Sequence, residues 1–360
     1  IWPRAANPDG SFGGALATVK EDRARHWTAA DIERRFEFGL RCAMSHGTVA
    51  IRTHLDCLAP QHRISWPLFA ELRDRWRDRI SLQAVALQAL DSLDDAAFAE
   101  ELATLVARFG GILGAVVYPS PSLADQLTRL LRLAARHGLD LDLHVDESLD
   151  EGARSLPVLA QAVLDERFAG RVVVGHCCSL TVQPPDEIDR TLDLMAAAGI
   201  GVVSLPMCNL YLQDRQAGRT PRRRGVTLLH EMAARGIPVA VASDNCRDPF
   251  YAYGDHDLLE VFRQAVRIAH LDHPFGAWPR SVTATPAALM GLPAGRLVEG
   301  AAADLVLFTA RSMNELLARP QSDRIVLRGG RAIDTSPPDY AELDDLFEPA
   351  RSLRDVAERA

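Results

Sequence analysis

The sequence predicts an α/β fold of the (β/α)8 barrel type. Apolar, β-branched runs alternate with helical patterns along most of the 360-residue chain. The stretches between successive runs are long enough to hold a helix, which implies parallel strands buried on both faces. Polar residues suited to catalysis follow several of the runs directly, as they do at the carboxyl ends of barrel strands.

Seven strands are predicted in chain order. They cover residues 47–56, 82–90, 112–119, 139–146, 171–178, 200–206 and 237–244. Helices with apolar residues at three- and four-residue spacing lie between them, at 98–110, 123–138, 188–199 and 226–236. Several of these helices end in a glycine just before the next strand, as a helix C-cap often does. Residues 257–271 and 281–292 are helical as well.

A closed barrel needs eight strands, and the sequence supplies seven. The chain starts at Ile1 in a loop-like stretch, IWPRAANPDG, so we expect the first strand to precede it. Residues 20–46 would then form the helix after that strand. Seven strands would also suit a doubly wound sheet, but the first strand-to-helix turn lacks the glycine fingerprint of a dinucleotide site.

The composition of the chain changes near residue 295. We predict a barrel over residues 1–294, the remnant of a small β-sandwich domain over 295–335, and a polar C-terminal tail over 336–360. The middle part is predicted because 295–308 and 324–334 look like short strands joined by glycine-rich turns.

Composition excludes several classes of function. The net charge of −8 comes with no separate basic face, which argues against a nucleic-acid partner. No apolar run reaches the roughly 18–20 residues of a membrane span. Six cysteines without a CxxC pair fit a reducing cytoplasm better than secretion. The only lysine, Lys20, lies in a polar stretch and is expected at the surface, which leaves no lysine for Schiff-base chemistry.

Residues with catalytic side chains follow the predicted strands. His144 and Glu147 end the fourth, His176 the fifth and Asp244 the seventh. A single buried histidine is usually a core residue, but several such endings on one face indicate a site. Histidine nitrogen and aspartate oxygen bind zinc or iron, and a carboxylate three residues past a ligand can pass protons. We expect Asp140 and Asp142 to face away from His144.

Four blocks of sequence carry a family resemblance. They are LDLHVDE, VVVGHCCS, SLPMCNLYLQDR followed by PRRRGVTLLHEM, and VASDNCRDPFYAYG. In this order they resemble the amidohydrolase superfamily, in particular its cytosine deaminase branch, over about residues 10–335. The resemblance implies an eight-stranded barrel with a small β-sandwich. It also implies one Fe²⁺ or Zn²⁺, held by a His-x-His pair on the first strand, a histidine on the fifth and an aspartate on the eighth.

The resemblance assigns roles to individual residues. It makes His144 and Asp244 metal ligands, Glu147 the proton shuttle and His176 the group that polarises the attacking water. Asp244 would also take a proton from that water. The two histidines of the first-strand pair are expected upstream of Ile1, because RTHLD at 52–56 holds one histidine and lies on the next strand.

Three residues are predicted to bind substrate. Gln88 matches a pyrimidine-binding glutamine, with the alignment displaced by about one residue, so a packed glutamine is an equal alternative. Asn245 stands where the cytosine deaminase branch often has an aspartate, and Phe250 where it has a stacking tryptophan. These differences keep a planar ring as the expected ligand but change its hydrogen-bond pattern.

The resulting functional prediction is a metal-dependent hydrolytic deaminase of a nitrogen heterocycle, cytosine-like, that converts a cyclic amidine and water into a ring carbonyl and ammonia. One alternative is hydrolysis of a ring amide or an alkylamino-heterocycle. Another is a metal-free binding or scaffold protein, if the histidine pair is truly absent. Because family members are often oligomers, a homo-oligomer is a further expectation.

Overall fold

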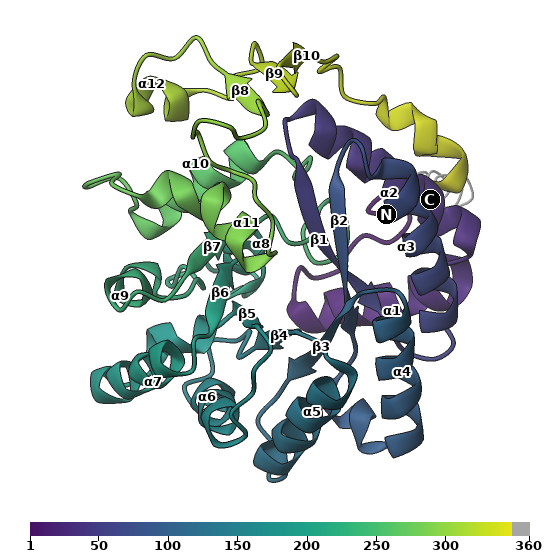
Figure 1. Cartoon of the computed structure of the whole chain (residues 1–360), viewed down its shortest axis with the longest axis vertical. Helices are drawn as coiled ribbons and strands as arrows, with labels where there is room; N and C mark the ends of the chain where they lie inside the picture. The colour runs from purple at the N-terminus through teal and green to yellow at the C-terminus, as the bar shows by residue number, and fades with distance from the viewer. Residues whose placement is uncertain (348–360) are drawn as a thin grey trace.

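The core of the protein is a parallel sheet surrounded by helices, as the computed structural model, which describes residues 1–347, shows (Figure 1). The strands are β1 (Ala50–Asp56), β2 (Ser81–Leu87), β3 (Ile112–Val117), β4 (Leu141–Val145), β5 (Val172–His176), β6 (Gly201–Ser204) and β7 (Val239–Val241). Each pairs in parallel with its sequence neighbour, in the order β1 to β7. All seven predicted strands are therefore confirmed, and their carboxyl ends meet at one edge of the sheet.

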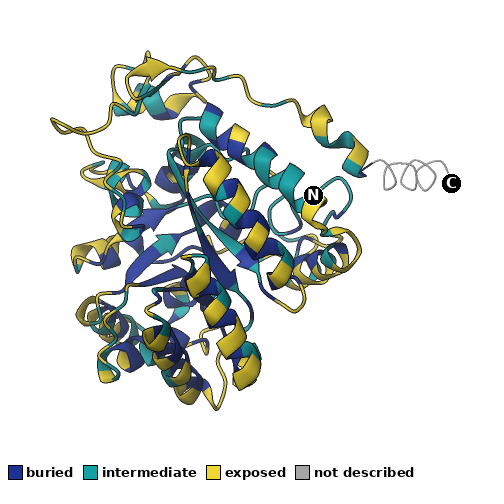
Figure 2. Ribbon diagram, turned by 45° about the vertical axis from the view of Figure 1, so that its right-hand side comes forward, coloured by how far each residue is buried: buried dark blue, intermediate teal, exposed yellow. Residues whose placement is uncertain are grey.

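Helices connect the strands and cover the outer face of the sheet. They are α3 (His62–Trp76), α4 (Ala96–Arg108), α5 (Leu123–His137), α6 (Ser155–Asp165), α7 (Pro185–Ala197), α8 (Pro206–Leu212) and α9 (Leu229–Ala234), with short 3-10 turns η1 (Leu90–Asp94) and η2 (Cys178–Val182). The strands are mostly buried, and the helices expose their outward faces (Figure 2).

The helix α5 illustrates why these segments fold as they do. Its apolar residues Leu127, Leu130, Leu131 and Ala134 recur at helical spacing and are buried. The helix ends at Gly138, which has a φ of 64° and donates its N–H to carbonyls of the last turn. The glycine-terminated helices expected from the sequence are thus present, and they turn the chain back toward the next strand.

The sheet curls into a partial barrel whose edge strands are β1 and β7. After β7 come α10 (Leu258–Ala269), the 3-10 turn η3 (Trp278–Val282) and α11 (Ala284–Leu289). Carbonyl oxygens of Leu289 and Met290 accept hydrogen bonds from Arg52 and Gln83, which lie near the amino ends of β1 and β2. The segment after β7 is therefore hydrogen-bonded to the first two strands. An eighth strand ahead of residue 1 stays a prediction.

The helix predicted over residues 20–46 is wrong in its extent. The chain forms two helices, α1 (Phe12–His26) and α2 (Ala29–Ser45). The break falls at Thr28, whose side chain accepts a hydrogen bond from Asp31 N at 3.2 Å and caps α2. A threonine cap inside an apolar helical pattern separates the two segments.

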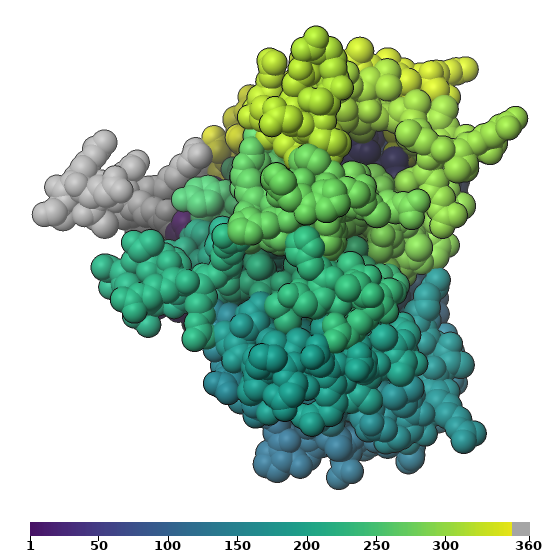
Figure 3. All heavy atoms as spheres, turned by 90° about the vertical axis from the view of Figure 1, so that its left-hand side faces the viewer, coloured from purple at the N-terminus to yellow at the C-terminus, as the bar shows by residue number. Residues whose placement is uncertain are grey.

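The C-terminal part forms an antiparallel sheet of β8 (Leu305–Leu307), β9 (Ile325–Arg328) and β10 (Arg331–Ala332), with α12 (Met313–Ala318) between β8 and β9 and a turn η4 (Tyr340–Leu343) after it. Arg324 joins it to the barrel through Asp257, with hydrogen bonds of 2.8 and 2.6 Å. The C-terminal part lies against α10 in the space-filling view (Figure 3). The division at 294 and 335 stays a prediction, and residues 348–360 of the predicted tail lie outside the described residues.

No helix within residues 1–347 combines the length and the apolar character needed to cross a membrane. All six cysteines are free, and five of them are buried.

Candidate active site

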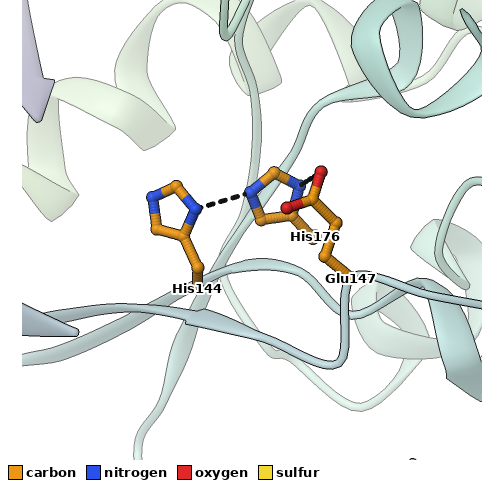
Figure 4. Close-up of side chains that lie close together, drawn as sticks. All are labelled: His144, Glu147 and His176. Carbon is orange, nitrogen blue, oxygen red and sulfur yellow. Dashed lines mark hydrogen bonds and ion pairs between the residues drawn. The ribbon is translucent and has the colours of Figure 1, made fainter. Parts of the chain in front are cut away.

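Two histidines meet at the carboxyl end of the sheet. His144 is near the end of β4 and His176 is the last residue of β5, on neighbouring strands. His176 Nε2 lies 3.0 Å from His144 Nδ1, and the ring centroids are 4.7 Å apart (Figure 4). The predicted convergence of these two imidazoles is present in the structure.

Glu147 faces the same pair. Its Oε1 lies 3.1 Å from His176 Nδ1. The amide of Asn209, on α8, donates from Nδ2 to Glu147 Oε1 and to His176 Nδ1, both at 3.1 Å. A residue from the segment after β6 therefore fixes the orientation of an acid after β4 and a histidine on β5.

Both imidazoles are held in the neutral form. Burial lowers the pKa of His144 well below its usual range, and His176 and His54 nearby act in the same direction. Burial also lowers the pKa of His176 to about 3, although its hydrogen bond with Asn209 opposes the shift. Neutral imidazoles offer the free lone pair that a metal ligand or a proton acceptor requires.

The two carboxyl groups are shifted in the opposite sense. Burial raises the pKa of Glu147 well above its usual range, and the charge of Asp244 adds to this effect. Burial raises the pKa of Asp244 to about 6. A carboxyl group whose pKa is raised retains its proton more readily and can act as a general acid, and a neighbouring carboxyl group with a lower pKa can act as a base.

The hydrogen bonds define one consistent arrangement of protons. Because Asn209 Nδ2 can only donate, His176 Nδ1 accepts, and the proton of the neutral ring is on Nε2. That proton points to His144 Nδ1. Asn209 Nδ2 also donates to Glu147 Oε1, so this oxygen and His176 Nδ1 are both acceptors and share the Asn209 amide as their donor.

The chain turns sharply at the site. Asp146, His176 and Asp244 have φ values of 50°, 70° and 67°, a region that residues other than glycine adopt rarely. Each such residue costs about 1–3 kcal/mol, and these conformations concentrate at functional sites. His176 and Glu147 meet at the site, whereas the Asp146 carboxylate between the strand and Glu147 turns toward the start of α6.

Asp146 holds one of these turns. Its carboxylate accepts hydrogen bonds from Ser155 N at 3.1 Å and Leu156 N at 3.0 Å, at the start of α6. We expect Asp146→Ala to lower the free energy of unfolding by about 1–3 kcal/mol, because two buried N–H groups lose their acceptor. Chemical denaturation measures the loss. Asp150→Ala in the same loop is the control, and an equal loss in both variants would contradict the prediction.

The predicted substrate-binding residues are less clearly placed. Gln88 is buried, its Nε2 donates to Gly114 O at 2.5 Å, and its Oε1 has no hydrogen-bond partner. The Asn245 amide donates to Asp248, and the ring of Phe250 packs edge-on against Phe12 with centroids 5.5 Å apart. Their roles in binding stay predictions.

Two residues that contact the candidate site or lie beside it were missed by the sequence reasoning. No role was assigned to Asn209 from the sequence, and nothing in its local sequence reveals that it binds both Glu147 and His176. Asp142 was expected to face away from His144, and this is wrong. Side chains two residues apart share a face of a strand, so Asp142 also points into the barrel, where Arg52 Nη1 binds it at 2.9 Å.

The residues present fit a divalent metal. One donor atom from each of His144, Glu147 and His176 lies within 4.8 Å of the other two, and residues 1–347 contain no other such group of three. Neutral imidazole and carboxylate are ligands of zinc and iron. Asp244, the second predicted ligand, is outside this group but close enough for its charge to raise the pKa of Glu147.

The model of the amidohydrolase family matches residues 84–333. The chain belongs to this family. This amidohydrolase is 59% identical over 348 residues to a pterin deaminase of Rhizobium rhizogenes, covering 96% of this chain and 80% of the relative. It is 23% identical over 340 residues to an N-isopropylammelide isopropyl amidohydrolase of Pseudomonas sp., covering 92% and 79%. The predicted activity, hydrolysis of C–N bonds other than peptide bonds, is confirmed.

Solved structures confirm the barrel fold of this amidohydrolase. A 5-methylcytosine deaminase from Klebsiella pneumoniae superposes with a TM-score of 0.81 at 24% identity, covering 93% of this chain and 82% of the other. An N-isopropylammelide isopropylaminohydrolase from Burkholderia multivorans gives a TM-score of 0.75 at 24% identity, covering 91% and 81%. An atrazine chlorohydrolase from Arthrobacter aurescens, with a TM-score of 0.62 at 18% identity, is complexed with zinc.

Proposed function

We propose that this amidohydrolase removes the amino group of a pterin by hydrolysis. The observation that carries the proposal is the 59% identity to a pterin deaminase along 96% of the chain. The other relatives with named substrates are 23–28% identical. A bicyclic pterin therefore replaces the cytosine-like ring expected from the sequence.

The two rings share the reacting unit. In both rings the amino-bearing carbon carries a C=N bond to a ring nitrogen, the cyclic amidine unit; its other ring neighbour is a second nitrogen in pterin and a carbon in cytosine. Addition of water to that carbon and loss of ammonia leave a ring carbonyl. The site residues thus keep the roles proposed for a cytosine-like substrate, and only the recognition of the outer ring changes.

The proton steps follow from the two shifted carboxyl groups. Glu147 gives its proton to the ring nitrogen beside the amino-bearing carbon, and Asp244 takes a proton from the attacking water, which His176 polarises. The proton left on the added oxygen passes through Glu147 to the amino nitrogen. The C–N bond breaks, ammonia leaves, and the proton on Asp244 returns to Glu147.

His144 and Asp244 would hold a divalent metal, Zn²⁺ or Fe²⁺, with His176 and Glu147 beside it. When bound, this ion supplies positive charge that brings the pKa of water to about 7. Asn209 binds both Glu147 and His176 and so fixes their orientation relative to each other. Gln88, Asn245 and Phe250 are proposed to contact the planar ring. The free cysteines support a cytoplasmic location.

Removal of the metal should abolish the reaction. We expect incubation with 1,10-phenanthroline to reduce ammonia release to less than a tenth, and added Zn²⁺ or Fe²⁺ to restore it. The non-chelating isomer 1,7-phenanthroline is the control. Full activity in protein shown by elemental analysis to hold less than 0.1 metal ion per chain would contradict the proposal.

A substrate screen tests the function directly. Ammonia release is measured with pterin and cytosine, and isopropylamine release with N-isopropylammelide, in each case with the Glu147→Gln variant in parallel. We expect kcat/KM for pterin to exceed that for the other two rings by at least about 100-fold, since a site that pairs polar edges rejects analogues steeply. Faster turnover of cytosine, or release of the alkylamine alone, would overturn the assignment.

A further inference from the structure

Polar side chains fill the interior of the barrel below the site. Arg52 on β1 donates from Nη1 to Asp142 Oδ2 at 2.9 Å and from Nε and Nη2 to Gln83 Oε1 at 3.1 and 2.9 Å. The side chains of Arg52 and Asp142 are 11% and 6% exposed. Buried charges are kept in a core when they are paired and fully bonded, and this pair spans the barrel from β1 to β4.

His54 connects this pair to the site. Its Nε2 lies 3.4 Å from Asp142 Oδ1, at ion-pair distance. This nitrogen atom is buried and has no hydrogen-bond partner. The edge of its ring meets the ring of His144, with centroids 4.7 Å apart and an interplanar angle of 83°. His144 is therefore in contact with two other imidazoles, His54 on one strand and His176 on another.

A glycine on β3 permits the neighbouring strands β2 and β4 to lie close to it. Gly114 on β3 pairs with Asp142 on β4. A Cβ atom at Gly114 would lie 2.6 Å from Asp142 O and 2.5 Å from Ala86 O, closer than real contacts allow. Because residue 114 is glycine, β3 has no side chain between β2 and β4 next to Asp142, the residue that Arg52 binds.

We propose that Arg52, Asp142 and His54 are positioning residues that fix the ring of His144, so that its Nδ1 faces His176. An imidazole turns by two-fold steps about its last side-chain torsion, which would exchange Nδ1 for a carbon atom. The hydrogen bond to His176 holds one side of the ring, and the His54 ring blocks the other. Partners behind a ligating histidine commonly set its orientation in this way.

The inference rests on the ligand role proposed for His144, and two substitutions at His54 test it. His54→Leu removes the flat ring at similar volume, whereas His54→Phe keeps the ring and loses the nitrogen. We expect side-chain ¹⁵N NMR to show doubled or broadened His144 signals in His54→Leu and a single set in His54→Phe. We expect kcat to fall about 10–100-fold in His54→Leu, with KM within about twofold of the wild type.

A second pair of variants tests the contribution of the Arg52–Asp142 ion pair. Asp142→Asn should disturb the His144 signals as His54→Leu does, and Asp140→Asn is its matched control. Asp140 directly precedes β4, at its amino end, where its 28% exposed side chain binds Arg171 N and Nε at 2.8 and 2.9 Å. The control should keep both the NMR signals and kcat.

Unchanged His144 signals and unchanged kcat in a folded His54→Leu variant would overturn the inference, even if Asp142→Asn failed to fold. A loss of kcat with unchanged His144 signals would overturn it too. If the wild type released no ammonia from pterin, the proposed function would fail. The NMR comparison of the His54 variants would still decide the positioning role.

Discussion

Replacement of Glu147 by glutamine is expected to lower kcat for ammonia release by about 10²–10⁴-fold, the range of general acid–base catalysis. Glutamine keeps the shape of glutamate and can still accept a hydrogen bond from Asn209, but it carries no transferable carboxyl proton. KM should change little, because the lost interaction is made mainly in the transition state. Steady-state ammonia release measures both constants.

Glu151→Gln is the matched control for this substitution. Glu151 lies four residues along the same loop and is exposed, so the same chemical change there should leave kcat unaltered. Both variants should melt within a few degrees of the wild type. Full activity in Glu147→Gln would show that another group transfers the proton.

Replacement of Arg4 by methionine is expected to lower the free energy of unfolding by about 3–5 kcal/mol. Arg4 donates to Asp22 at 2.7 Å and to Asp31 at 2.6 Å, and the three side chains are 4%, 4% and 7% exposed. Methionine fills a similar volume but leaves two buried carboxylates with less positive charge. Urea denaturation at neutral pH measures the change.

An exposed ion pair provides the contrast. Arg25 binds Glu21 at 2.7 Å on α1, and their side chains are 68% and 60% exposed. Arg25→Met should change the free energy of unfolding by no more than about 0.5 kcal/mol, because water and salt screen such pairs. If the two variants lost equal stability, burial would not explain the contribution of Arg4.

The strands and the site histidines could be predicted because their signals are local. An apolar run followed by His144 or His176 identifies both a buried strand and a polar group at its end. The parallel order then follows from the helices between the runs, and with it the convergence of the strand ends. Residue type and distance along the chain are sufficient for this part.

Other features depend on contacts between segments far apart in sequence. Asn209 binds Glu147, 62 positions away, and Arg52 binds Asp142, 90 positions away. The sequence around these residues contains no pattern that predicts either pairing. Asp142 is a different case, because the two-residue period of the strand was sufficient to place it beside His144. Likewise, Thr28 was available as a cap signal for the break between α1 and α2.

The double hydrogen bond of Asn209 constrains how this enzyme can diverge. Any rearrangement of α8 that changes the position of Asn209 would also turn Glu147 and His176. The segment around Asn245 and Phe250 makes no hydrogen bond to Glu147 or His176 within residues 1–347. Variants selected for a new substrate should therefore first accumulate substitutions in the segment around Asn245 and Phe250. Substitutions on α8 should follow only together with compensating substitutions in the residues next to it.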